Sequence, residues 1–254
     1  MKLSKHKANA LIALSLFTFV FLAAEFRFDV NVGLLAGPQR VVISQGFVLG
    51  ASVLGLMGYA PLSSLTSRVA RPQIITIIAT VIALVGLLQI QVPSHTRVLE
   101  AFGCIAFFAL GLLGAAAHHA FAMAFKDDLK LATGAGAAYA SGILIQFGIN
   151  LLDCGGTGEA AVLGIATIGI ALFSCLALQN FKVDEPLRTN SAAATLIPIR
   201  QACWSVALVV VLACLFSTLD SVVTLSNAHG TIAVQTWPRL CLAASGLLAG
   251  FVFD

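Results

Sequence analysis

Charged residues are unusually scarce in this sequence. Charged side chains make up 10% of its 254 residues, whereas an ordinary soluble domain has roughly 25%. The apolar share is 59%, against about 45–50% in such a domain, and the mean hydropathy is +0.99. So few polar groups cannot cover the surface of a soluble core, which excludes a soluble globular fold. A bilayer provides the missing apolar solvent, so the composition predicts a polytopic membrane protein.

Signatures of catalysis are also absent from the sequence. It has no Gly-x-Ser-x-Gly elbow, no Walker loop, no His-Glu-x-x-His pair and no long polar segment that would hold an active site. Its six cysteines have neither CxxC nor zinc-ligand spacing, so we expect free thiols that pack as small apolar groups. We therefore predict that the protein is not an enzyme and has no cofactor or metal.

Long apolar runs are what the sequence does have. A helix that crosses a bilayer needs about 20 apolar residues, and eight runs approach or exceed that length: 9–28, 41–62, 72–92, 99–124, 131–152, 159–180, 201–224 and 237–254. The expected fold is an all-α, polytopic transmembrane helix bundle of about eight helices. Residues 1–180 form a six-helix unit, the polar, proline-bearing segment 181–199 is a cytoplasmic linker, and 200–254 supply the first two helices of an incomplete second bundle.

The distribution of lysine and arginine predicts the orientation. With the N-terminus inside, ten of the fourteen basic residues, including every lysine, fall on inner segments. We therefore expect a multi-pass protein of the cytoplasmic membrane, with the lipid bilayer as its partner. The net charge of +3 follows from this bias, so no nucleic acid is expected to bind this segment.

An internal repeat carries a family resemblance. "LGASVLGLMG" (Leu49–Gly58) is similar to "LAASGLLAGF" (Leu242–Phe251), 193 residues later. "FDVNVGLLAG" at the outer end of the first span is likewise similar to "LDSVVTLSNAHG" at that of the seventh. A second half that restarts the first after a longer inner loop resembles the plan of the major facilitator superfamily.

A loop motif adds to this resemblance. "GFVFD", which contains Gly250 and Asp254, resembles the start of that family's Gly-x-Leu-Ala-Asp cytoplasmic motif. The equivalent segment after the second span keeps Gly58, Arg68 and Arg71 but has no aspartate. The resemblance implies that Asp254 lies inside a turn signature and that the chain is a fragment lacking about four helices.

The same resemblance implies the function. "GAAAHHA", "GILIQFGINLL" and "SGLLAGFVFD" resemble facilitator-type proteins of anaerobic actinobacteria, some of which carry a C-terminal helix-turn-helix domain. The first expectation is a secondary transporter that moves a small-molecule solute by alternating access, coupled to an ion or proton. The alternative is the membrane sensor domain of a helix-turn-helix transcriptional regulator.

Acidic residues within the spans are the first candidates for the site, because charge is costly in lipid. Glu25 and Asp29 in the first span and Asp220 in the seventh occupy repeat-related places near the outer side. In the facilitator plan, helices one, four and seven line the central path, so these acids would form a paired acidic mouth. The alternative is that Glu25 and Asp29 are interfacial acids that Arg27 partly neutralises.

Polar residues of the fourth and fifth spans are the other candidates. His118 either relays protons or hydrogen-bonds a neighbouring helix, and the glycines on its stripe allow a close helix approach. Gln146 and Asn150 lie along one face of the fifth span. They either contact the solute or join two helices through their amides.

The topology can be tested by labelling in intact cells. A membrane-impermeant maleimide should react with Cys154, in a predicted outer loop, and should not react with a cysteine placed at Lys182 in the predicted inner linker. Labelling of residue 182 from outside would contradict the orientation.

Overall fold

A computed structural model describes residues 4–65, 71–126, 128, 130–152, 155–179, 226, 230 and 237–253. Its elements are helices, and no strand occurs in that part of the chain. They are α1 (Lys5–Ala36), α2 (Pro38–Leu65), α3 (Arg71–Gln91), α4 (Thr96–Ala124), α5 (Leu131–Leu152), α6 (Gly155–Leu178) and α8 (Trp237–Phe253). The predicted linker 181–199, the predicted span 201–224 and Asp220 lie outside the described residues.

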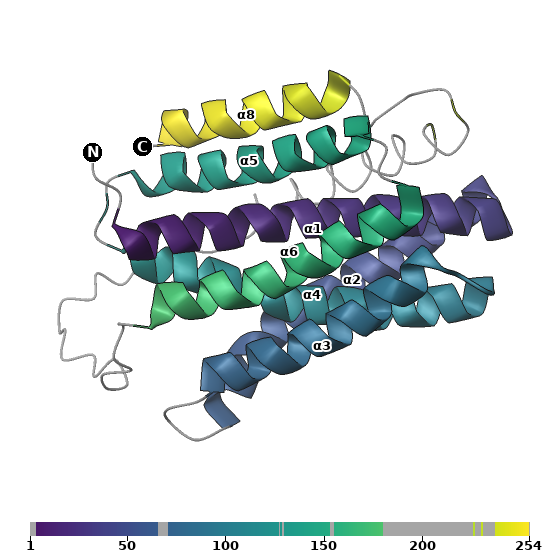
Figure 1. Ribbon diagram of the computed structural model, residues 1–254, viewed down its shortest axis with the longest axis horizontal. Helices are drawn as coiled ribbons and strands as arrows, with labels where there is room; N and C mark the ends of the chain where they lie inside the picture. The colour runs from purple at the N-terminus through teal and green to yellow at the C-terminus, as the bar shows by residue number, and fades with distance from the viewer. Residues whose placement is uncertain are drawn as a thin grey trace, which may run out of the picture.

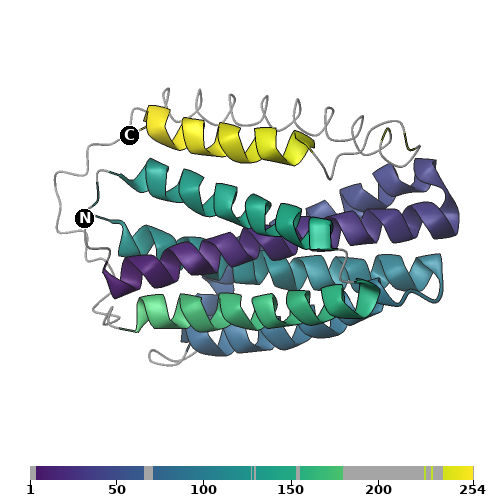
Figure 2. The ribbon, with the colours of Figure 1, turned by 45° about the horizontal axis from the view of Figure 1, so that its top comes forward.

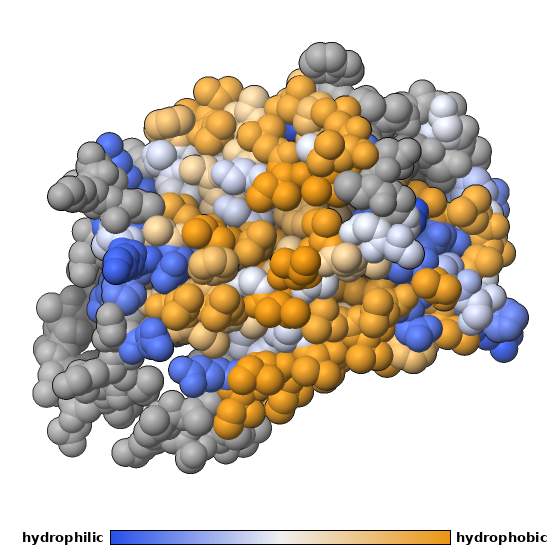
Figure 3. Space-filling model, in the orientation of Figure 1, coloured by the Kyte–Doolittle hydropathy of each residue, from blue (hydrophilic) through white to orange (hydrophobic). Residues whose placement is uncertain are grey.

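The helices α1 to α6 are each long and apolar enough to cross a membrane, and α8 is a shorter apolar helix. Hydrophobic residues cover the middle of the face seen in Figure 3, and hydrophilic residues gather toward its two ends. A protein that spans a bilayer needs such an apolar band on its surface, where it meets the hydrocarbon core. The chain is therefore an all-helical, multi-pass membrane protein, as the composition predicts.

The helix ends differ from the predicted spans where capping, rather than hydropathy, decides them. The predicted span 9–28 is part of α1, which runs from Lys5 to Ala36. The Ser4 hydroxyl accepts a hydrogen bond from the Lys7 amide at the start of α1, and Gly37, at φ +86°, ends it. Asp29 and Asn31 end the apolar run but leave the helix intact. At 1.5 Å per residue, its 32 residues exceed a hydrocarbon core of about 30 Å.

The helices run roughly alongside one another, and both ends of the chain lie at the same side of the bundle (Figure 1). We call that side, where Lys7 meets Asp128, the Lys7 end. The opposite side, where Arg40 meets Glu100, is the Glu100 end. Helix α4 packs against α1, α2, α3 and α6, whereas α8 packs against α5 at the edge of the described helices (Figure 2).

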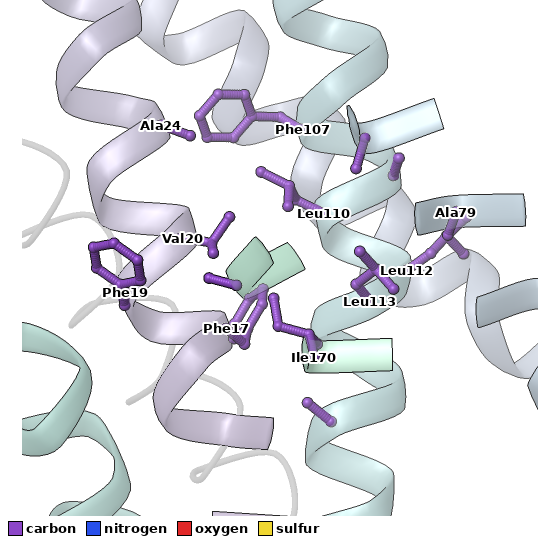
Figure 4. Packing of buried hydrophobic residues seen from close by; sticks show 14 of the residues in the cluster. Phe17, Phe19, Val20, Ala24, Ala79, Phe107, Leu110, Leu112, Leu113 and Ile170 are labelled. Carbon is purple, nitrogen blue, oxygen red and sulfur yellow. The ribbon is translucent and has the colours of Figure 1, made fainter. Parts of the chain in front are cut away.

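The core between α1 and α4 is built from large apolar side chains. Phe28 and Phe107 are fully buried, and their rings meet edge to face with centroids 6.2 Å apart. Buried side chains of α1, α3, α4 and α6, among them Val20, Phe107 and Ile170, belong to the same cluster (Figure 4). By contrast, α3 and α6 expose long apolar side chains, as lipid-facing helices do: Ile77, Ile78, Leu88, Ile165, Ile168 and Leu172.

Glycines bring the α2 and α4 backbones into contact. A Cβ added to Gly55 would lie 2.1 Å from the Phe108 carbonyl oxygen, and one added to Gly111 would lie 2.1 Å from that of Ser52. The expected close approach at Gly111 is thus confirmed. On the same stripe of α4, Gly103 and Gly114 instead receive the rings of Phe28 and Phe17.

A similar contact joins α5 to both of its neighbours. Gly142 lies against the α1 backbone, where an added Cβ would be 2.5 Å from the Ser15 carbonyl oxygen. Toward α8, a Cβ on Gly136 would be 2.5 Å from the Gly246 oxygen, and one on Gly250 would be 2.7 Å from the Ala132 oxygen. Small residues therefore hold α5 between α1 and α8 at backbone distance.

The α2–α4 contact can be tested with alanine. Gly111→Ala should lower stability by about 1–3 kcal/mol, because its methyl group would meet a backbone that cannot move aside. Gly50→Ala on α2 is the matched control: nothing lies within 4 Å of its added Cβ, so it should be neutral or stabilising by up to about 1 kcal/mol. Thermal unfolding in detergent measures both, and equal melting temperatures for the two variants would contradict the contact.

Candidate polar site and apolar cavity

A polar cluster joins four helices toward the Glu100 end. A guanidinium nitrogen of Arg239, in the first turn of α8, donates to the Gln146 amide oxygen of α5. On the other side, the Gln45 amide of α2 donates to a Glu25 carboxylate oxygen of α1 at 3.0 Å. The negative charge of Glu25 acts on Arg239, so the two pairs belong to one cluster.

The cluster is buried and carries unused hydrogen-bond donors. Arg239 is 7% exposed and Gln146 is 1% exposed. Arg239 Nε, Gln146 Nε2 and Asn150 Nδ2 are buried and have no hydrogen-bond partner among the residues that the structure describes. Buried donors without acceptors are costly, at about 1–3 kcal/mol each, which marks this cluster as a candidate binding site.

The place of Arg239 along its helix adds to this cost. Because it lies in the first turn of α8, its charge coincides with the positive end of the helix dipole. A cation is disfavoured there, and an anion is favoured. Within the described residues Glu25 supplies one negative charge nearby, while Gln45 binds that carboxylate from the opposite side.

An apolar cavity of about 360 Å³ lies between α1, α5 and α8. Its lining comes from all three helices: Phe17, Thr18, Phe21, Leu22, Tyr139, Ile143, Leu242, Ser245 and Gly246. Residues three apart share a helix face, so Ile143 lies one turn from Gln146, and Leu242 lies one turn from Arg239. The cavity therefore ends about one helical turn, roughly 5 Å, from the polar cluster.

His118 of α4 meets Tyr139 of α5 beside this cavity. Its Nδ1 lies 2.7 Å from the Gly114 carbonyl oxygen and its Nε2 lies 2.5 Å from the Tyr139 hydroxyl. A carbonyl oxygen can only accept, so Nδ1 carries the hydrogen in the contact with Gly114. The predicted hydrogen bond from His118 to a neighbouring helix is confirmed; proton relay stays a prediction.

Arg27 has partners other than its sequence neighbours Glu25 and Asp29. It donates to the Gln91 amide oxygen of α3 at 3.1 Å, and its guanidinium lies 3.6 Å from the Glu159 carboxylate of α6. It therefore links α1 to α3 and α6. Glu25 belongs to the Arg239 cluster, and Asp29 follows it by one turn on α1. The predicted pairing of these acids with Asp220 stays a prediction, because Asp220 is outside the described residues.

Two further ion pairs fasten the ends of the bundle. At the Glu100 end, Arg40 of α2 donates twice to the Glu100 carboxylate of α4, at 2.7 and 2.9 Å, and Ser44 donates to it at 2.6 Å. At the Lys7 end, the Lys7 ammonium donates to Asp128 at 2.7 Å. This bond, helped by the Lys130 amide, lowers the pKa of the Asp128 carboxyl. The contribution of that pair is thus present at neutral pH and is lost as the pH falls through the lowered pKa.

The described residues of the predicted loop motif belong to helices. Gly58 is within α2, and Gly250 is near the end of α8, where its carbonyl oxygen accepts from Thr133 of α5 at 3.4 Å. Arg71 begins α3, while Arg68 and Asp254 are outside the described residues. In the part of the chain that the structure describes, no group of three His, Cys, Asp or Glu residues is arranged to hold a metal ion.

Sequence reasoning missed Arg239 and Gln45 as members of the site. A signal for Arg239 was available, since it is the third residue of the predicted apolar span 237–254. Gln45 gave no signal, because a single amide in an apolar helix usually joins helices.

No protein-family model, no curated protein and no solved structure matches this chain.

The pairing of Gln146 with Arg239 can be tested through stability. Gln146→Leu should cost about 1–3 kcal/mol, because it leaves the buried guanidinium without its acceptor. Gln146→Glu, which restores an acceptor, should unfold close to the wild-type temperature. Ser141→Ala on the exposed side of α5, where the hydroxyl bonds only its own helix, is the control. Equal melting temperatures for Gln146→Leu and Ser141→Ala would contradict the pairing.

Proposed function

We propose that the protein is a secondary transporter, which moves a small solute across the cytoplasmic membrane by alternating access and is coupled to an ion or proton. The observation that carries the proposal is the apolar cavity between α1, α5 and α8, with a buried, incompletely paired arginine one turn away. Ionisable residues at membrane depth commonly mark solute or ion pathways. Substrate sites of secondary transporters lie between their repeated units.

The origin of the cavity walls supports this mechanism. Under the proposed two-bundle plan, α1 and α5 belong to the first bundle and α8 belongs to the second. The cavity then lies between the two bundles, and a rocking movement of one against the other changes the side from which it is reached. Within the α5–α8 contact, Gly136, Gly246 and Gly250 bring the two backbones close together, and Gly246 also lines the cavity.

The candidate residues then take separate roles. Arg239, Gln146 and Asn150 supply polar contacts to the solute, and Phe17, Leu22 and Ile143 enclose its apolar part. Glu25, Asp29 and His118 are the titratable groups near this path, and they are the proposed coupling residues. Asp220 joins them on the strength of its repeat-related position in the sequence.

The alternative function, a membrane sensor domain of a helix-turn-helix regulator, would use the same cavity in a different way. A sensor needs a ligand site whose occupancy shifts the helices, and access from one side is sufficient. A transporter must expose the cavity to both sides in turn. Two-sided access therefore distinguishes the two functions without knowledge of the solute.

Access can be measured with a single cysteine at Ser245, on the cavity wall of α8. The six native cysteines are first replaced by alanine. Ser245→Cys is then treated with a membrane-impermeant maleimide in right-side-out and inside-out vesicles. We expect labelling from both sides, because alternating access opens the cavity to each side in turn.

Ile165→Cys on α6 is the matched control. Ile165 is 72% exposed on the apolar outer face, so it should resist the water-soluble reagent from both sides. If Ser245→Cys is labelled from one side alone, or labelled no faster than Ile165→Cys, the transport function is wrong.

A further inference from the structure

The buried polar groups beside the cavity that lack partners among the described residues are all hydrogen-bond donors, so their ligand must supply acceptors. Arg239 Nε, Gln146 Nε2 and Asn150 Nδ2 all donate and cannot accept. Arg239 and Gln146 are more than nine-tenths buried and come from facing helices. A group that satisfies all three must offer several acceptor oxygens, and an anionic group also offsets the arginine charge and the positive end of α8.

The charges of the cluster disfavour a ligand with two negative charges. Among the described residues it contains one cation, Arg239, and one nearby acid, Glu25. A dianion such as a phosphate ester would meet the Glu25 carboxylate with only one guanidinium to balance it. A carboxylate matches the planar guanidinium and brings one charge and two acceptor oxygens.

The cavity determines the rest of the ligand. It begins about one helical turn from the donors and is walled mainly by Phe17, Phe21, Leu22, Ile143 and Leu242. Its volume of about 360 Å³ falls at the small end of ligand pockets, which span roughly 300–1,000 Å³. It suits a compact apolar body rather than a polar or highly charged one.

We infer that Arg239, Gln146 and Asn150 bind the carboxylate of an apolar monocarboxylic acid, whose hydrocarbon body lies in the cavity between α1, α5 and α8. This inference rests on the proposed function in that it names the substrate class of the same site. Gln45 of α2 donates to the Glu25 carboxylate and so occupies part of the acceptor capacity of the one acid that the described residues place near Arg239. Such an acid can come from water, as a small aromatic or branched carboxylate, or from the bilayer, as a fatty acid.

Equilibrium binding tests the inference on the full chain in lipid nanodiscs at neutral pH. Radiolabelled benzoate represents the water-soluble source, and laurate represents the bilayer source. Benzamide has the same ring without the charge, and acetate has the charge without the body. We expect benzoate or laurate to bind at least about tenfold more tightly than both benzamide and acetate, and the tighter of the two identifies the source.

Three variants at the site and one control variant separate recognition from folding. Arg239→Gln should weaken carboxylate binding by about tenfold or more, because it removes the charged donor, and Arg239→Lys should retain part of it. Gln146→Glu places a carboxylate where the ligand would bind, so it should abolish binding while the protein stays folded. Arg97→Gln is the matched control. It alters an exposed arginine in the first turn of α4, outside the cluster, and should bind as the wild type does.

The inference is overturned if neither carboxylate binds, if benzamide binds as tightly as benzoate, or if Gln146→Glu leaves binding unchanged in folded protein. These results are distinct from a failure of the proposed transport function. That failure would be shown by one-sided labelling of Ser245→Cys, which is measured without any ligand. Two-sided labelling without carboxylate binding would overturn the substrate class alone. Carboxylate binding with one-sided labelling would support the site and point to the sensor.

Discussion

Close approach of helix backbones is the constraint on which the rest of this structure depends. Lipid tails are as apolar as leucine, so helices inside a bilayer gain little from burying leucine against one another. They associate where small residues let main chains touch, and α4 does so against α2 through Gly111 and Gly55. Helix α5 uses Gly142 against α1 and Gly136 against α8 in the same way. The large side chains of the core then fill the spaces that these contacts leave.

Polar contacts fix the ends of helices that glycine contacts have brought together. Arg40 with Glu100, Arg27 with Glu159, and Lys7 with Asp128 each join different helices or a helix and a loop. Each is at least partly exposed at one end of the bundle, where charge can be hydrated. The Arg239 cluster differs, because its arginine is nearly fully buried and part of its donor capacity is unused within the described residues. Helix association does not require an arginine with unused buried donors, whereas ligand binding does make use of such donors.

The sequence predicts the apolar helices well and their partners poorly. Apolar runs are visible because hydropathy depends on composition alone. Of the eight predicted runs, six are helices long enough to cross a membrane and a seventh is the shorter helix α8, while 201–224 lies outside the described residues. Their ends depend on local capping, so α1 continues from the predicted end at residue 28 to Ala36, where Gly37 stops it. Which polar groups meet depends on how each helix is turned about its axis. Arg27 therefore points to α3 and α6, and Arg239 reaches Gln146, 93 residues earlier in the chain.

The place of the site within the bundle connects the two proposals. Helix α8 packs against α5 through glycine contacts, and the cavity and the Arg239 cluster lie beside the same seam. A ligand there touches α1, α5 and α8 together, so its binding energy depends on how α8 sits against the other two. Any movement of α8 along α5 would change the distance between Arg239 and Gln146 and with it the fit of a carboxylate. Because a ligand shifts an equilibrium only by its difference in affinity between two states, a head group held by donors on both helices is well suited to drive that movement.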